Sequence, residues 1–157
     1  ALPLTPPRVS NEAKLIEAYI QTKDRDPYDD ILKLEFDTQT RIIQESDPWL
    51  SFCPYASTWQ MEAWIMPKQH ITSLGECSES DLFGLATHLL AISRQLTQLG
   101  ISHNLTINQG STPQQRLTIK ILGRSVLSPP GGLEVMTDLM VNPIPPESAA
   151  DWYRRGI

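Results

Sequence analysis

A lysine and a histidine stand two residues apart just after an apolar stretch of the sequence. Residues Glu62–Met66 are rich in large apolar side chains, and Pro67, which has no backbone N–H, ends the strand that they predict. Lys68 and His70 would therefore lie together at a strand end, where an ammonium group and an imidazole could hold a phosphate or a metal ion. The alternative is a surface lysine beside a histidine that only packs.

More cationic side chains follow a polar loop later in the chain. Residues 108–115 are rich in amides, and Arg116, Lys120 and Arg124 come next. Arginine and lysine side chains, together with backbone N–H groups of glycine-containing loops, commonly bind phosphate. The alternative is that Arg116 and Lys120 face solvent on an edge strand, where charges discourage edge-to-edge pairing. The members of the predicted anion site are Lys68, His70, Asn108, Gly110, Ser111, Arg116, Lys120 and Arg124.

Two segments of the chain resemble parts of one known family. The first is Pro-Tyr-Ala-Ser at 54–57 followed by Met-Glu-Ala-Trp-Ile-Met-Pro-Lys-Gln-His at 61–70, and the second is residues 132–137 leading into 141–150. They are similar to the second half of the galactose-1-phosphate uridylyltransferase family, a member of the histidine-triad superfamily, with the second segment resembling the closing segment of that half. The two segments occur in the family's order, and the resemblance covers residues 26–150. It implies the fold of that half.

The resemblance places the chemistry of histidine-triad proteins on Leu117–Leu122. Those proteins carry alternating histidines there, and residues two apart on a strand share a face, so a nucleophile and its supporting groups can meet one phosphate. In this sequence the three positions hold Arg116, Thr118 and Lys120. A threonine hydroxyl is a poor nucleophile near neutral pH without a base to activate it. In the transferases, moreover, the nucleophilic His-Pro-His comes from the other half, so we expect no catalytic residue in this chain.

The resemblance also implies the positions of a zinc site. The family often has a Cys-x-x-Cys pair just ahead of residues 31–32, and here those positions are Asp26 and Asp29, while His70 and Arg116 hold the other two. Carboxylates can bind Ca²⁺ or Mg²⁺ but are poor substitutes for thiolates at tetrahedral zinc, and a cation at a ligand position opposes a metal ion. We therefore expect no metal and no cofactor, with the two aspartates in a solvated acidic turn.

The period of apolar residues predicts the elements that would position these groups. Three prolines in the first seven residues favour an extended arm at 1–9, followed by one domain at 10–157. The fold class is α+β: a histidine-triad-like antiparallel sheet of about five strands, with a long helix and an N-terminal helix packed on it. The predicted elements are a helix at Ser10–Gln21 capped by Ser10, a polar loop at Lys23–Asp30, paired strands at Arg41–Glu45 and Leu50–Cys53, a strand at Glu62–Met66, a helix from Ser78 to Gly100, strands at Asn104–Asn108 and Leu117–Leu122, and a short helix after Pro145-Pro146.

Composition limits the classes of partner. The chain has 157 residues, 40% hydrophobic content, a net charge of −5 and no run of basic residues, which argues against nucleic acid. No stretch reaches the ~20 apolar residues of a membrane span, so we expect no membrane insertion. Cys53 and Cys77 are expected to be reduced thiols, and His88 to lie on the surface of the long helix. We expect the cytoplasm, or an organelle stroma or matrix if the missing start methionine reflects a removed transit peptide.

The predicted function is a catalytically silent uridylyltransferase-like domain that acts as a protein-interaction or structural subunit. Its partner would be another subunit or a second copy, and a phosphate-containing small molecule is also possible. Two alternatives are open: a nucleotide or sugar-phosphate binding module, and a nucleotidyltransferase of the hexose-1-phosphate uridylyltransferase type with a nucleophile supplied by a partner. The surface expected to meet a partner contains Trp59, Trp64, Leu133–Val141, Trp152 and Tyr153.

Overall fold

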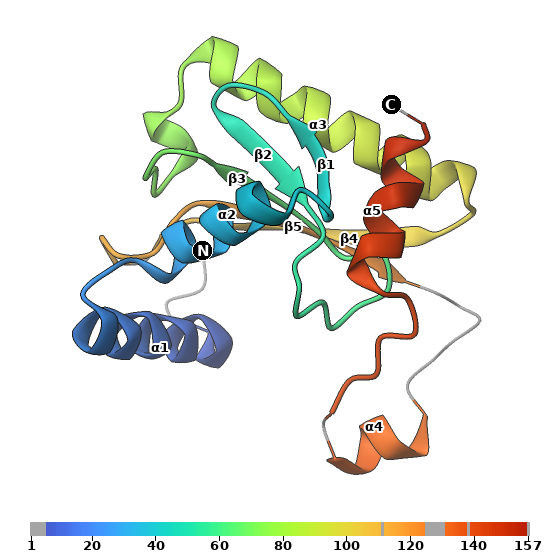
Figure 1. Ribbon diagram of the computed structural model, residues 1–157, viewed down its shortest axis with the longest axis horizontal. Helices are drawn as coiled ribbons and strands as arrows, with labels where there is room; N and C mark the ends of the chain where they lie inside the picture. The colour runs from blue at the N-terminus through green and yellow to red at the C-terminus, as the bar shows by residue number, and fades with distance from the viewer. Residues whose placement is uncertain (1–5, 111, 125–130, 138, 157) are drawn as a thin grey trace.

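The computed structural model describes residues 6–110, 112–124, 131–137 and 139–156. At its centre is a five-stranded antiparallel sheet with the strand order β1-β2-β3-β5-β4 (Figure 1). The predicted α+β class, with a long and an N-terminal helix on a five-stranded sheet, is confirmed. The elements are α1 Pro7–Lys23, α2 Pro27–Thr38, β1 Ile42–Glu45, β2 Trp49–Phe52, β3 Ala63–Pro67, the 3₁₀ turn η1 Leu74–Glu76, α3 Glu79–Gln98, β4 Ser102–Asn108, β5 Thr118–Arg124, α4 Gly132–Thr137 and α5 Pro146–Arg154.

The two faces of the sheet bury two separate apolar clusters. Side chains alternate between faces along a strand, so Ile65 of β3 joins one cluster and Met66 the other. The first cluster packs under α3 and α5, and the second under α1 and α2. Figure 1 shows α2 and α3 on either side of the sheet. The sheet is therefore the middle layer of three.

The prediction of an extended arm at residues 1–9 is wrong for its last part. Helix α1 begins at Pro7, with Pro6 at the N-cap position and Ser10 inside the first turns. Proline is tolerated at the first helical position because the N–H that it lacks would have no intrahelical partner there. The rest of the predicted arm, residues 1–5, lies outside the described residues.

The predicted polar loop at Lys23–Asp30 is also wrong, because its second half begins helix α2. Asp26 is the N-cap, and its Oδ1 accepts a hydrogen bond of 2.8 Å from the backbone N–H of Tyr28. Pro27 takes the first helical position and Asp29 lies in the first turn. An aspartate followed by proline starts a helix as readily as a turn, and only the packing of Leu32 beneath the sheet distinguishes the two outcomes.

The central hairpin and the long helix follow the predictions. Strands β1 and β2 pair in antiparallel register, and β2 pairs with β3. Helix α3 begins with a capping box between Ser78 and Asp81. Gly100 follows its C-terminal end with φ of 67°, a left-handed conformation that glycine adopts without a Cβ penalty.

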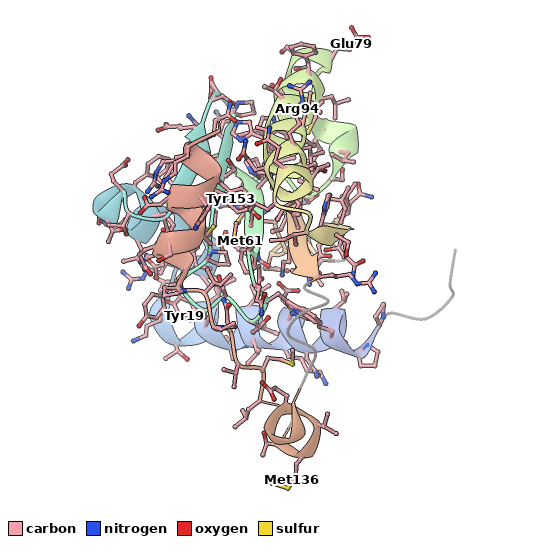
Figure 2. All side chains as sticks on the ribbon, turned by 90° about the vertical axis from the view of Figure 1, so that its right-hand side faces the viewer. Tyr19, Met61, Glu79, Arg94, Met136 and Tyr153 are labelled. Carbon is pink, nitrogen blue, oxygen red and sulfur yellow. The ribbon has the colours of Figure 1, made fainter. Side chains whose placement is uncertain are left out.

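Helix α4 stands apart from the sheet (Figure 1). Its Met136 lies at the opposite end of the molecule from Glu79 in Figure 2. Val135 and Met136 are 74% and 81% exposed, so most of the surface of both residues faces solvent. The segment therefore carries an apolar surface that this fold does not cover.

Candidate functional site

Four residues from three parts of the chain meet where β3 ends, α2 begins and β5 starts. Arg116 Nη2 lies 3.2 Å from Asp26 Oδ2 and 2.5 Å from Asp29 Oδ1. His70 Nδ1 lies 3.4 Å from the same Asp26 oxygen. These are the four residues that the sequence placed at the positions of a zinc site. The structure brings them together around the guanidinium of Arg116, which supplies the positive charge of the cluster.

The two aspartates of this cluster are ion-paired with Arg116 at the start of a helix and do not form the expected acidic turn, although the Asp29 side chain is 64% exposed. Asp26 combines two roles, because Oδ1 caps α2 while Oδ2 binds Arg116. The Arg116 side chain is buried, and its Nε and Nη1 atoms have no hydrogen-bond partner among the described residues. Burial without partners costs free energy, so the ion pairs at Nη2 must hold this side chain in place.

Arg116, Thr118 and Lys120 point to the face of the sheet that α1 and α2 cover. Thr118 Oγ1 donates a hydrogen bond of 3.2 Å to the carbonyl oxygen of Arg116. Lys120 Nζ lies 3.6 Å from Glu12 Oε1 of α1 and 4.3 Å from the centre of the Trp64 ring. The alternative of solvent-facing cations on an edge strand is wrong, because β5 lies between β3 and β4 and both side chains are buried.

The other members of the predicted anion site lie at several places. Lys68 Nζ lies 3.2 Å from Glu45 Oε1, while the Gly110 N–H donates to the carbonyl oxygen of Thr72. Arg124 is exposed at the opposite end of β5 from Thr118. His70 Nε2 contacts the carbonyl oxygen of Pro113 at 2.9 Å. Of the predicted set, the structure brings His70 and Arg116 together, and Ser111 lies outside the described residues.

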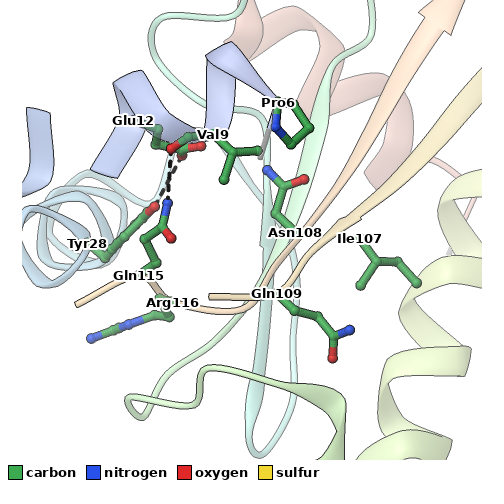
Figure 3. Close-up of a pocket in the computed structure, with 9 residues that line it drawn as sticks. All are labelled: Pro6, Val9, Glu12, Tyr28, Ile107, Asn108, Gln109, Gln115 and Arg116. Carbon is green, nitrogen blue, oxygen red and sulfur yellow. Dashed lines mark hydrogen bonds between the residues drawn. The ribbon is translucent and has the colours of Figure 1, made fainter. Parts of the chain in front are cut away.

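A cavity of about 400 Å³ lies beside this cluster, between the start of α1, the end of β4 and the start of β5 (Figure 3). Tyr28 Oη donates a hydrogen bond of 3.1 Å to Glu12 Oε1 at its wall, and burial, aided by the Glu12 charge, raises the pKa of this tyrosine. Figure 3 shows the Arg116 guanidinium pointing away from Asn108 and Gln109. The lining residues are Pro6, Val9, Glu12, Tyr28, Ile107, Asn108, Gln109, Gln115 and Arg116.

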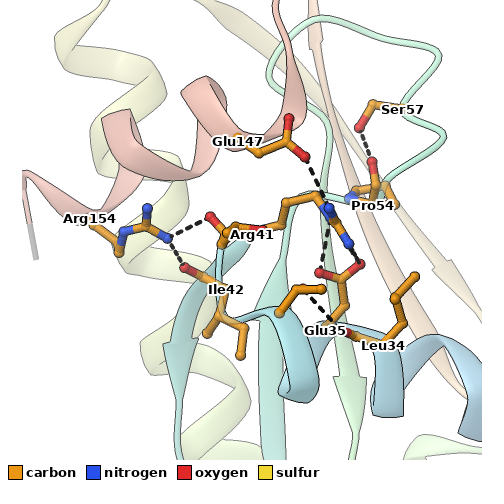
Figure 4. Close-up of polar contacts among 10 residues, drawn as sticks. Leu34, Glu35, Arg41, Ile42, Pro54, Ser57, Glu147 and Arg154 are labelled. Carbon is orange, nitrogen blue, oxygen red and sulfur yellow. Dashed lines mark hydrogen bonds and ion pairs between the residues drawn. The ribbon is translucent and has the colours of Figure 1, made fainter.

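A second group of charges, which the sequence did not indicate, ties α2 and α5 to β1. The Arg41 guanidinium donates from Nε and Nη2 to Glu35 and from Nη1 to Glu147 Oε1 at 3.0 Å (Figure 4). Burial raises the pKa of the Glu35 carboxyl, whereas a backbone hydrogen bond and Arg41 lower the pKa of Glu147. This group is structural, because its donors and acceptors satisfy one another between three elements.

The prediction that His88 lies on the surface of the long helix is wrong, because the residue is 1% exposed. Its Nε2 lies 2.8 Å from Ser46 Oγ and its Nδ1 lies 3.0 Å from Ser51 Oγ. Burial lowers the pKa of His88 to about 4. The position next to the apolar stripe of α3 faces the β1–β2 hairpin, where two serine hydroxyls complete its hydrogen bonds.

The aromatic residues predicted at a partner surface differ in exposure. Tyr153 is buried and donates a hydrogen bond of 2.6 Å to the carbonyl oxygen of Met61, so the prediction that it forms an exposed anchor is wrong (Figure 2). Trp152, the next residue on α5, is 47% exposed. Trp64 is half-buried against Phe52 and Trp59 is also half-buried. Two parts of the predicted partner surface lie outside the described residues, namely the side chain of Leu133 and the whole of Asp138.

Two negative observations apply to the part of the chain that the structure describes. No group of three or more histidine, cysteine, aspartate or glutamate side chains there could hold a metal ion. None of the described helices combines the length and the apolar character that crossing a membrane requires.

The sheet and its helical layers define a histidine-triad-like fold. A zinc-bound histidine-triad family protein from Mycobacterium smegmatis matches 73% of this chain and 81% of its own, with a TM-score of 0.55 and 17% identity. Residues 12–108 match the family model described as galactose-1-phosphate uridyl transferase, C-terminal domain. The chain belongs to this family.

Two longer proteins match nearly the whole chain. ADP-glucose phosphorylase from Arabidopsis thaliana is 28% identical over 163 residues, which cover 98% of this chain and 44% of that protein. A solved uridylyltransferase structure has a TM-score of 0.88 at 23% identity, over 99% of this chain and 52% of its own. The chain therefore spans about half the length of these two longer proteins.

Proposed function

We propose that this uridylyltransferase-like domain is catalytically silent and acts as a protein-interaction or structural subunit that pairs with another domain. The observation that carries the proposal is the state of the row formed by Arg116, Thr118 and Lys120. Each of these side chains is engaged by its own chain, through Asp26 and Asp29, through a backbone carbonyl, and through Glu12. All three side chains are thus held by ion pairs or hydrogen bonds within this chain.

The chemistry of Thr118 supports silence. Covalent nucleotidyl transfer needs a nucleophile whose proton a neighbouring base can accept. The Thr118 hydroxyl gives its proton to a carbonyl oxygen that cannot act as a base, and the residue is 2% exposed. Electrostatics point the same way, because the carboxylates of Asp26, Asp29 and Glu12 would repel a phosphate approaching Arg116 and Lys120.

The exposed apolar side chains support a partner. Val135, Met136 and Leu139 are each more than 60% exposed and belong to one short segment, and such patches commonly mark interaction sites. Since the chain spans 52% of a uridylyltransferase structure with the same fold, a complementary half is the partner that the proposal favours. A second copy of this chain would serve the same surface.

A labelling assay tests the silence. The purified chain is incubated with radiolabelled UDP-glucose or ADP-glucose and a hexose phosphate, and then denatured. We expect neither labelled protein nor exchange of the nucleotidyl group. Thr118→His is the matched variant and should stay inactive, because Arg116 and Lys120 flank it in place of supporting histidines. A covalent nucleotide adduct on the unmodified chain would refute the proposal.

A specific observation favours one other function, a nucleotidyltransferase whose nucleophile comes from a partner. The relative that matches 98% of this chain is named ADP-glucose phosphorylase, and the cavity beside Arg116 offers amides and a tyrosine at its wall. Mixing the chain with its co-purified partner distinguishes the two. The active assembly is favoured if the partner becomes labelled only when this chain is present, and if Arg116→Ala lowers that labelling at least tenfold.

A further inference from the structure

The Ser51 hydroxyl has one proton and two acceptors within reach, the carbonyl oxygen of Gln44 at 3.2 Å and His88 Nδ1 at 3.0 Å. We assign the proton to the bond with Gln44, so that Ser51 Oγ accepts at the His88 contact and Nδ1–H is the donor. A neutral imidazole protonated at Nδ1 has a free lone pair on Nε2, which accepts the hydroxyl proton of Ser46 at 2.8 Å.

From this arrangement we propose that Ser46 is a nucleophilic serine, with His88 as its base and Ser51 as the residue that positions the base, and that it reacts with activated acyl groups. The proposal goes beyond the nucleotidyl-transfer chemistry of the family and does not rest on the proposed function, because it concerns a site apart from the silent row of Arg116, Thr118 and Lys120. Serine, imidazole and a third group that sets the tautomer are the parts that activate a hydroxyl for acyl transfer.

The location of Ser46 suits a reaction with an external molecule. It follows β1 directly, at the turn to β2, and is partly exposed, whereas His88 and Ser51 are buried beneath it. The backbone N–H of Ser46 donates to the carbonyl oxygen of Trp49 at 2.9 Å and fixes the turn. Its neighbours Glu45 and Asp47 both contact Lys68 Nζ, so a cation lies beside the turn.

The step balances within these groups. Ser46 Oγ attacks the carbonyl carbon of an aryl ester, the new Oγ–C bond forms, and the bond from that carbon to the aryloxide oxygen breaks. The hydroxyl proton passes to His88 Nε2 and from there to the departing aryloxide. Because burial lowers the pKa of His88 to about 4, the base is neutral at pH 7 but weak. Weak basicity restricts the reaction to acyl groups with good leaving groups.

The test uses the whole chain with 4-nitrophenyl acetate and, separately, a fluorophosphonate probe. We expect release of 4-nitrophenolate with one acetyl group added per chain, and a single probe adduct, both mapped to Ser46 by fragmentation. Ser46→Ala should remove both adducts. His88→Gln should slow them by roughly 100-fold, the lower end of general-base effects. The control is Ser102→Ala, whose hydroxyl donates to the carbonyl oxygen of Arg124 on the neighbouring strand, and it should label at the normal rate.

A second variant keeps the proposal testable if His88→Gln fails to fold. Ser51→Ala retains the base but removes the acceptor that fixes its tautomer, so labelling should slow by about tenfold while near-ultraviolet circular dichroism stays unchanged. Ser51→Thr keeps the hydroxyl, so a labelling rate that returns in this variant would show that Ser51 acts by positioning His88 and not by its packing alone. An unlabelled Ser46 in the folded protein, or equal rates with and without the imidazole, would overturn the proposal.

Discussion

Arg116 Nη2 and Asp29 Oδ1 lie 2.5 Å apart, in a cluster that joins the start of β5 to the first turn of α2. The same guanidinium nitrogen binds Asp26, which also caps α2. One arginine therefore binds two of the three other residues for which the resemblance implies zinc-ligand positions, and the third, His70, contacts Asp26. In this cluster a cation lies between two carboxylates, as a metal ion lies between anionic ligands.

We expect Arg116→Ala to destabilise the protein by about 2 to 3 kcal/mol, because removal of one member of a buried pair leaves the other unpaired. The value is below the usual range for buried pairs, since the Asp29 side chain is 64% exposed and solvent screens it. Urea unfolding followed by tryptophan fluorescence measures the change. Asp29→Asn is the matched control and should cost less than about 1 kcal/mol. Equal losses in the two variants would show that the buried pair contributes nothing special.

Purified protein should contain no stoichiometric zinc. The four candidate positions hold Asp26, Asp29, His70 and Arg116, and the arginine cation already occupies the centre that a metal ion would need. Elemental analysis after dialysis against a chelator measures the content, with the same buffer as the blank. One zinc per chain that survives chelation, and that His70→Ala removes, would contradict the ion-pair interpretation.

His88 should make the protein less stable in acid. Burial lowers its pKa to about 4 from 6.5, so between these values the unfolded chain binds a proton that the folded chain does not. Stability conferred by the neutral imidazole is therefore complete above about pH 6.5, falls as the pH drops toward 4, and falls no further below that. A pKa difference of about 2.5 corresponds to about 3 kcal/mol.

The measurement for His88 is the free energy of unfolding in urea at a series of pH values from 8 to 4. Other groups titrate in the same window, so the quantity to compare is the difference between the unmodified protein and His88→Gln. The glutamine variant should lack this part of the acid-induced loss. Parallel curves for the two proteins would mean that His88 keeps its ordinary pKa in the folded state.

Trp152→Ala should weaken assembly with a partner or a second copy by about 1 to 3 kcal/mol, as truncation of an aromatic anchor does at interfaces. The side chain is 47% exposed, and the Arg155 guanidinium lies 5.4 Å from the ring centre. Sedimentation at micromolar concentration measures the association. The adjacent Tyr153→Phe supplies the contrast, because it loses a buried hydrogen bond to Met61 and should lower stability by about 1 to 3 kcal/mol without changing assembly. A monomer with no partner in native extracts would refute the interaction surface.

The sequence by itself determined the order of the elements and the alignment to a half-molecule. Alternating apolar residues identified the strands, and the helical period with Ser78 and Asp81 identified α3, because both signals depend on neighbours in the chain. The same signals fail for α2, because the residue types around Asp26-Pro27 predict a polar loop where the helix begins. Local residue types do not distinguish these outcomes; the helix exists because Leu32 packs beneath the sheet.

Only the tertiary structure decided what the polar residues do. The sequence placed Asp26, Asp29, His70 and Arg116 at related positions, but ion pairing depends on burial and on distances between segments that are up to 90 residues apart. The same holds for His88, whose serine partners lie 42 and 37 residues away, and for Arg41, which joins Glu35 to Glu147. Charge and hydrogen-bond partners are chosen by proximity in space, which a linear pattern does not record. The pleat of a strand, by contrast, is set by the residues next to each other along it.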